Sequence, residues 1–176
     1  MRRYHQFAWK DSNFRIASSH VNLITAEVIR QRALLEEHIR RQPEFRTSLV
    51  PIPLHPEAPA IARLMHEASE RTGVGPMAAV AGAIAQFAAQ AALLAGAREA
   101  IVENGGDIYL ASDQEVFVAL YAGEASGLAG RLAFAITPDR LPLAVCSSSS
   151  RMGHSLSFGD CDLATVVSRD AALADA

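Results

Sequence analysis

Apolar positions follow a helical period in the first half of the chain and alternate like strands in most of the second. Residues 22–42 carry an apolar stripe, with Asn22 as the expected N-cap and Pro43 as the stop. Residues 59–72 repeat the i, i+3, i+4, i+7 spacing, and Gly73 is expected to end that helix in the left-handed conformation. A third, alanine-rich helix is predicted over residues 76–96.

Short alternating runs predict the strands. Residues 4–9 and 14–18 flank a polar turn and predict a hairpin at the start of the chain. After residue 99, further strands are predicted at 100–103, 108–111, 116–121, 132–136, 143–146 and 163–167. Their short connections favour antiparallel neighbours in one sheet. The prediction is therefore a single α+β domain over residues 1–176, with an antiparallel sheet packed against long helices.

Composition narrows the possible partners and the compartment. A net charge of −3 gives no electrostatic reason to expect nucleic-acid binding. The uncharged stretch 72–97 is long enough to span a bilayer, but it is mostly alanine and contains Gln86 and Gln90. A buried central helix is expected there, and no membrane partner. No apolar run follows Arg2 and Arg3, so no export signal is expected and the chain is assigned to the cytoplasm.

Three glycine- and serine-rich segments, residues 73–77, 103–107 and 146–154, carry the candidate chemistry. Small residues let a ligand approach the backbone, and the N–H and hydroxyl groups there suit phosphate oxygens. A small-molecule, nucleotide-like ligand is therefore expected. His154 is the candidate for proton transfer, with a purely structural hydrogen-bonding role as the alternative. The expected ligand-binding residues are Gly75, Pro76, Met77, Asn104, Gly105, Gly106, Asp107, Ser148, Ser149 and Arg151.

Residues 73–85 (GVGPMAAVAGAIA), the 103–108 loop and residues 153–159 (GHSLSFG) together resemble a bacterial and archaeal branch of the ApbE-like superfamily. That superfamily contains the FAD:protein FMN transferases, once described as thiamine-biosynthesis lipoproteins. The resemblance covers essentially the whole chain. It implies an ApbE-like fold, FAD or FMN as ligand, His154 in the chemistry and Mg²⁺ bound by Asp175. It also implies a C-terminal segment beyond Ala176.

The sequence departs from the pattern of those enzymes at two places. Ala79 and Val80 stand where the enzymes have a lysine, and Ser157 and Phe158 replace an Asp-Pro pair. Three functions therefore stay open: a magnesium-dependent flavin-nucleotide transferase, a non-catalytic binding or scaffold protein, and a sulfur-assimilation factor of homocysteine synthesis. In the third, Cys146 or Cys161 would carry sulfur as an accessible thiolate; otherwise both are expected as free buried thiols. Apolar sheet edges also suggest a homo-oligomer.

Overall fold

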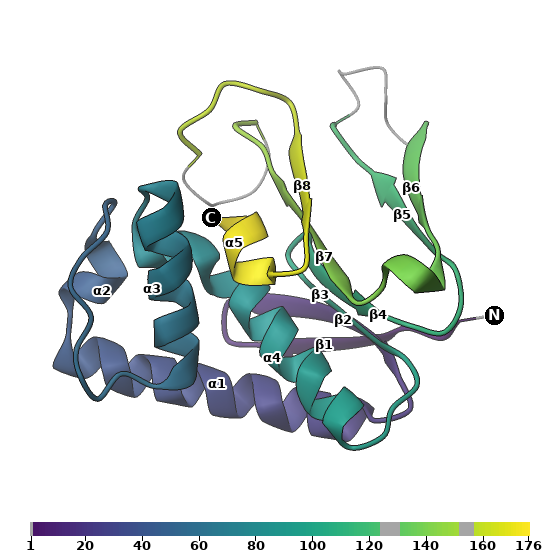
Figure 1. The fold of residues 1–176 in the computed structure, drawn as a ribbon, viewed down its shortest axis with the longest axis horizontal. Coiled ribbons are helices and arrows are strands. Elements are labelled where there is room, and N and C mark those ends of the chain that lie inside the picture. Colours follow the sequence, from purple (N-terminus) through teal and green to yellow (C-terminus); the bar gives the residue numbers. More distant parts are fainter. Residues whose placement is uncertain (1, 124–130, 152–156) are drawn as a thin grey trace.

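The chain folds into a six-stranded antiparallel sheet with helices on one face and a separate two-stranded ribbon on the other (Figure 1). The computed structural model describes residues 2–123, 131–151 and 157–176. The strand order of the large sheet is β1-β2-β3-β4-β7-β8. Its strands are β1 (His5–Trp9), β2 (Ser12–Ser18), β3 (Ala100–Asn104), β4 (Asp107–Ala111), β7 (Leu143–Ser148) and β8 (Ala164–Ser168). The predicted α+β class, with an antiparallel sheet against helices, is confirmed.

The helical layer follows the apolar periodicity closely. Its elements are α1 (Val21–Arg41), α2 (Glu44–Thr47), α3 (Ala60–Thr72), a 3-10 turn η1 (Pro76–Ala79), α4 (Val80–Leu94) and α5 (Ala171–Asp175), and a further 3-10 turn, η3 (Pro138–Arg140), follows the ribbon. Gly73 ends α3 with a φ of 78°, as predicted. The expected N-cap at Asn22 is wrong, since His20 occupies that position. The Ser18 hydroxyl accepts the His20 N–H at 3.1 Å, and this turn starts the helix two residues earlier.

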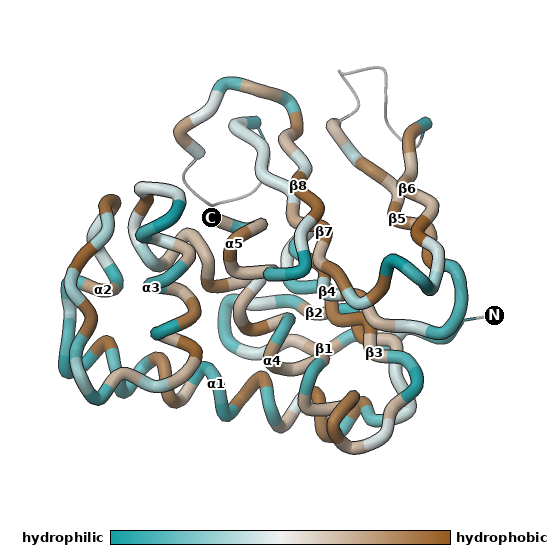
Figure 2. Tube along the Cα trace, viewed as in Figure 1, coloured by the Kyte–Doolittle hydropathy of each residue, from teal (hydrophilic) through white to brown (hydrophobic). Residues whose placement is uncertain are grey.

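Helix α4 forms the centre of the main core. It packs against α1, β3, β4 and α5, and its alanines allow these neighbours to approach closely. The apolar segments of these elements run together through the middle of the molecule (Figure 2). By length and composition alone, Pro76–Leu94 could cross a membrane, a property shared by central helices of globular domains. Its fully buried positions include Ala83, Ala85 and Ala88.

The ribbon is a departure from the single sheet expected from the sequence. Strands β5 (Val116–Leu120) and β6 (Leu132–Ile136) pair with each other and form a two-stranded sheet of their own. Val116, Val118 and Ile136 are buried in a second core against the face of the large sheet that points away from the helices. A two-stranded ribbon is marginal by itself, so this packing is what stabilises it.

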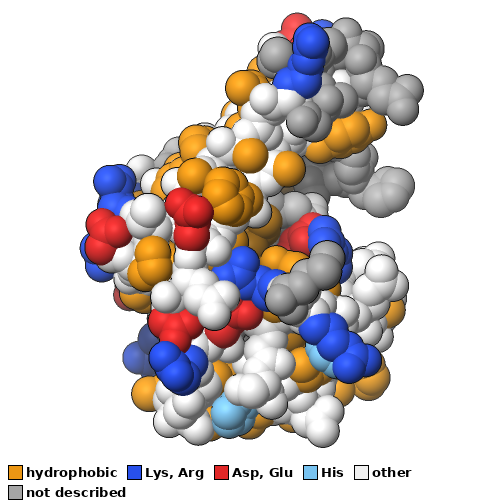
Figure 3. Space-filling view, turned by 90° about the vertical axis from the view of Figure 1, so that its right-hand side faces the viewer, with side chains coloured by type: hydrophobic (Ala, Val, Ile, Leu, Met, Phe, Trp, Pro, Cys, Tyr) orange, Lys and Arg blue, Asp and Glu red, His pale blue; other side chains and the backbone are white. Residues whose placement is uncertain are grey.

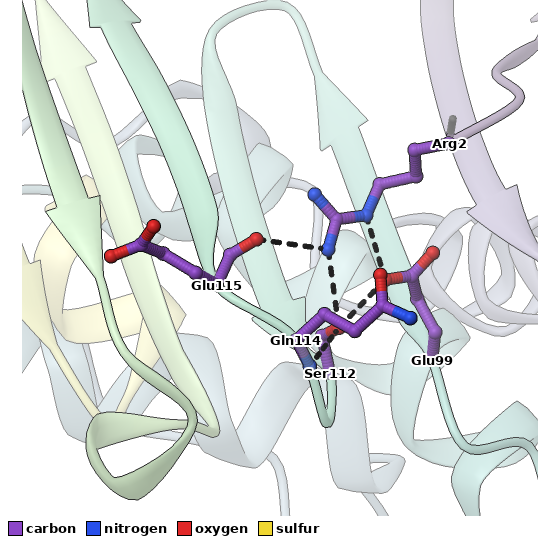
Figure 4. A network of polar contacts seen from close by, with 5 residues as sticks. All are labelled: Arg2, Glu99, Ser112, Gln114 and Glu115. Atoms are coloured by element: carbon purple, nitrogen blue, oxygen red, sulfur yellow. Dashed lines mark hydrogen bonds and ion pairs between the residues drawn. The ribbon is translucent and has the colours of Figure 1, made fainter.

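A polar network fixes the point where the ribbon leaves the large sheet (Figure 4). The Arg2 guanidinium donates to the Glu99 carboxylate at 2.7 Å and to the carbonyl of Glu115 at 3.2 Å. The Ser112 hydroxyl donates to Glu99 and accepts the N–H of Gln114. The start of the chain is thereby tied to the short connection between β4 and β5.

Candidate functional site

A cavity of about 500 Å³ lies at one end of the large sheet, between the sheet and the helices. All three segments singled out in the sequence contribute to its wall: Gly75 from before η1, Gly105 from the β3–β4 turn, and Ser147 to Ser149 from the end of β7. The chain between α2 and α3 adds Ser48 and Leu49, which no sequence signal marked. Three loops far apart in the sequence therefore share one hollow.

Two acidic side chains meet in this cavity. Asp107 is the first residue of β4 and Asp175 the last of α5, and their carboxyl groups are in hydrogen-bonding contact. An oxygen of Asp175 accepts the Gly82 N–H at 2.8 Å, and an oxygen of Asp107 accepts the Ser147 N–H at 3.3 Å. Asp107 is buried, and the Asp175 carboxyl group is enclosed although its residue keeps some exposed surface.

Burial dominates the electrostatics of this acid pair, Asp107 and Asp175. It raises the pKa of Asp107 to about 6. Hydrogen bonds with the Ser147 N–H, the Cys146 thiol and Asp175 lower this pKa, but by less than burial raises it. Burial and then the charge of Asp107 raise the pKa of Asp175 well above its usual range. Two carboxyl groups in contact rarely ionise together, so we expect the pair to hold one proton near neutral pH. Among the described residues, the cavity wall contains no lysine or arginine.

Gly82 is the residue that brings Asp175 into place. A Cβ atom at this position would lie 2.3 Å from the backbone oxygen of Ala171, so α5 can dock on α4 only where no side chain intervenes. With α5 docked in this way, the Asp175 carboxylate accepts the backbone N–H of Gly82. Gln86, one turn further along α4, accepts the N–H of Ala171 at 2.7 Å and fixes the start of α5.

Other residues expected at the site lie beside the cavity. The Asn104 amide donates to the backbone oxygen of Ala81 at 3.2 Å and joins β3 to α4. Pro76 is buried and Met77 packs against the main core. Gly106 lines the neighbouring cavity on the ribbon side of the sheet. Among the expected binding residues, the wall of the acid-pair cavity thus contains Gly75, Gly105, Asp107, Ser148 and Ser149.

The third loop also contains two further expected residues, Arg151 and His154. Arg151 pairs with Asp162 at 2.9 Å and with Asp160 at 3.5 Å, and it is not part of the described cavity wall. His154 lies outside the described residues. Their assigned roles stay predictions.

Cys146, on β7, is a neighbour of the acid pair. Its thiol is buried and donates to the backbone oxygen of Ala171 at 3.6 Å. Burial and the neighbouring carboxylates of Asp107 and Asp175 raise the pKa of this thiol far above its usual range. A buried thiol of this kind is a poor nucleophile. Both cysteines are free, and Cys161 is half-buried, so the expectation of two buried thiols holds for Cys146 alone.

No group of three or more histidine, cysteine, aspartate or glutamate side chains suited to a metal ion occurs among the described residues. The acid pair alone could therefore supply two carboxylate ligands, and any further ligands would have to come from backbone, water or a bound molecule.

Comparison with known proteins places the chain among archaeal relatives. It is 48% identical over 161 residues to a UPF0280 protein of Methanothrix thermoacetophila, covering 91% of this chain and 67% of that protein. It is 43% identical over 159 residues to a UPF0280 protein of Methanococcus aeolicus, covering 89% of this chain and 64% of that protein. It is 46% identical over 149 residues to a UPF0280 protein of Methanothermobacter thermautotrophicus, covering 85% of this chain and 57% of that protein. The chain thus spans about two thirds or less of these relatives.

These matches correct the resemblance to the ApbE-like superfamily of FAD:protein FMN transferases, which is wrong as a family assignment. The relatives are UPF0280 proteins, and the family model that matches residues 5–176 is described as AbpE bacteria. The glycines of segment 73–85, which suggested the transferases, have structural roles: Gly73 ends α3, Gly75 packs against the Ser48 backbone and Gly82 packs against the Ala171 backbone. The chain belongs to the family described as AbpE bacteria.

Proposed function

We propose that this protein binds a phosphorylated, nucleotide-like small molecule through a divalent cation held by Asp107 and Asp175. The observation that carries the proposal is the contact between two enclosed carboxyl groups, with no lysine or arginine in the described wall around them. Burial of such a pair is unfavourable unless a proton or a cation compensates the charge. A divalent cation would replace the shared proton and relieve the repulsion.

The residues present fit magnesium better than a softer metal. Mg²⁺ prefers oxygen ligands and is commonly held by one or two carboxylates together with waters and substrate phosphates. The acid pair offers oxygen ligands, and the absence of a third acidic, histidine or cysteine ligand among the described residues leaves room for phosphate oxygens. When bound, such an ion would neutralise charge on a phosphate group.

The surrounding backbone suits the phosphate itself. The chain at Gly75 leads into the continuous helical segment Pro76–Leu94, whose N-terminal end carries a partial positive charge and opens on the cavity. Ser148 and Ser149 add hydroxyl groups at the end of β7, next to Ser147, whose N–H is donated to Asp107. Flavin nucleotides such as FAD and FMN are the ligands to test first, and a magnesium-dependent group transfer is the reaction that such a site would favour.

A sulfur-carrying role has less support. Cys146 would need an accessible thiolate, whereas its thiol is buried beside two carboxyl groups. The choice between a transferase and a non-catalytic binding protein depends on turnover, for which His154 stays the predicted proton-transfer residue.

Calorimetric titration with FAD, FMN and ADP, each with and without Mg²⁺, tests the proposal. We expect binding that requires Mg²⁺ in the wild type and is at least about tenfold weaker in Asp175→Asn. The matched control is Asp162→Asn, because Asp162 is an exposed carboxylate outside the cavity that pairs with Arg151. Binding that is indifferent to Mg²⁺, or equal in Asp175→Asn and wild type, would refute the cation-mediated site.

A further inference from the structure

A second cavity, of about 400 Å³, lies on the other face of the large sheet, beneath the ribbon. We call it the ribbon groove. Its apolar walls come from the sheet, from the ribbon and from the segment before β8, and their larger side chains are Ile108, Val118, Leu120, Tyr121, Val145 and Leu163. Hydrophobic side chains also gather over the part of the surface that the ribbon occupies (Figure 3).

The groove exists because the ribbon diverges from the sheet toward its tip. Val116, Val118 and Leu120 all point to the same side of β5, since strand side chains alternate. Val116 is 2% exposed and Val118 7%, whereas Leu120 is half-buried. The ribbon and the sheet thus diverge progressively (Figure 1), and the ribbon groove lies between them.

The ribbon groove adjoins the acid-pair cavity. Gly105, Ser147 and Ser149 line both. The β3–β4 turn lies where the two cavities meet, and its Gly105 and Gly106 have φ values of 65° and 110°. Among the described residues, no atom lies within 4 Å of a Cβ atom placed at either glycine, so these residues leave the space beside the turn unfilled. A single elongated ligand could therefore occupy both cavities.

The two cavities differ in chemistry. The acid-pair cavity contains two carboxyl groups and would hold phosphate through a cation. The described wall of the ribbon groove is mainly apolar, and Glu103 is its one charged residue. Glu103 pairs with Arg15 at 3.2 Å. A carboxylate at the rim repels phosphate but can accept from a ring N–H or amino group. Apolar walls with one placed polar group are typical of sites that orient an uncharged ring.

We infer that the ribbon groove binds the aromatic ring of the same ligand whose phosphate lies at the acid pair, and so determines ligand specificity. This inference rests on the proposed function for the location of the phosphate. The ligand class is a phosphate ester that carries a planar, largely apolar ring with hydrogen-bond donors at its edge. An adenine ring and a flavin ring both satisfy this description.

The test compares ligands with and without a ring, all in the presence of Mg²⁺: pyrophosphate, ADP and FMN. For the wild type we expect ADP or FMN to bind at least about tenfold more tightly than pyrophosphate. Leu120→Trp should fill the groove and remove that advantage, with pyrophosphate binding unchanged. Comparing the affinities for ADP and FMN shows whether the groove prefers an adenine ring or a flavin ring.

Control variants keep the result interpretable. Ala135→Trp places the same bulky ring on the outer side of the ribbon, opposite Phe117 on β5, and should leave all three affinities unchanged. If Leu120→Trp fails to fold, Leu163→Trp narrows the groove from its other wall.

The outcomes separate the two proposals. Magnesium-dependent pyrophosphate binding without any gain from a ring, or equal effects of Leu120→Trp and Ala135→Trp, would overturn the ribbon groove and leave the cation site standing. Ring-dependent binding lost in Leu120→Trp but independent of Mg²⁺ and of Asp175 would support the groove and refute the cation site. No binding of any of the three would refute both.

Discussion

Replacing Gly82 with alanine tests whether close packing of α5 on α4 holds the acid pair together. The added Cβ atom would lie 2.3 Å from the Ala171 oxygen and 2.8 Å from its carbonyl carbon. Both atoms belong to the backbone, so α5 as a whole must move. Over-packing of this kind costs about 1–3 kcal/mol, and the weakened hydrogen bond from Gly82 to Asp175 costs about 1–3 kcal/mol more.

The higher helix propensity of alanine offsets about 1 kcal/mol of this cost. We therefore expect Gly82→Ala to lower the free energy of unfolding by about 3 kcal/mol, or Tm by about 6–12 °C. Urea unfolding followed by circular dichroism measures the change. Gly159→Ala is the matched control, because Gly159 is exposed, has ordinary φ and has no neighbour within 4 Å. A urea midpoint of unfolding that is the same in Gly82→Ala and in the wild type would refute this account of the packing.

Three further predictions concern titration and thiol reactivity. In the folded protein the pKa of Asp107 is raised to about 6, so its stabilising contribution is complete below about pH 4 and lost as pH rises through 6. Without divalent ions at pH 8, the free energy of unfolding of Asp107→Asn should therefore be higher than that of the wild type by roughly 2 kcal/mol. Equal urea midpoints for the two proteins would contradict this prediction. Burial lowers the pKa of His38, so the contribution of His38 to stability should fall as pH drops below about 6.5. When unfolding is compared at pH 7.5 and 5.5, His38→Leu should therefore lose less stability on acidification, or gain more, than the wild type. An identical change in both proteins would exclude a contribution from His38. In native protein, one thiol, Cys161, should react rapidly with a thiol reagent, and Cys146 should react only after unfolding; two fast thiols would show that Cys146 is accessible.

The helices and most strand positions could be predicted from the sequence because their signals are local. The stripe from residue 22 to 42 and the left-handed Gly73 each depend on neighbours within one turn. The N-cap of α1 was missed because the Ser18 turn competes with Asn22 for the start of the helix. The ribbon was missed because β5 and β6 alternate like any strand, and a local pattern does not say which sheet a strand joins.

The site could be predicted in part, since its backbone loops carry glycine and serine signals. Gly75, Gly105, Ser148 and Ser149 were found from such signals and line one cavity. The contact between Asp107 and Asp175 joins residues far apart in the sequence, and no spacing rule indicates it. The role of Gly82 likewise depends on an approach to Ala171 that only the fold defines.

Direct titration of the protein with Mn²⁺, following the free ion by electron paramagnetic resonance at pH 7.5, tests the acid pair as a cation site most directly. We predict one site per chain in the wild type and in Asp162→Asn, and an affinity at least about tenfold lower in both Asp107→Asn and Asp175→Asn. Wild-type affinity in either acid-pair variant, or no bound Mn²⁺ in the wild type, would contradict the account.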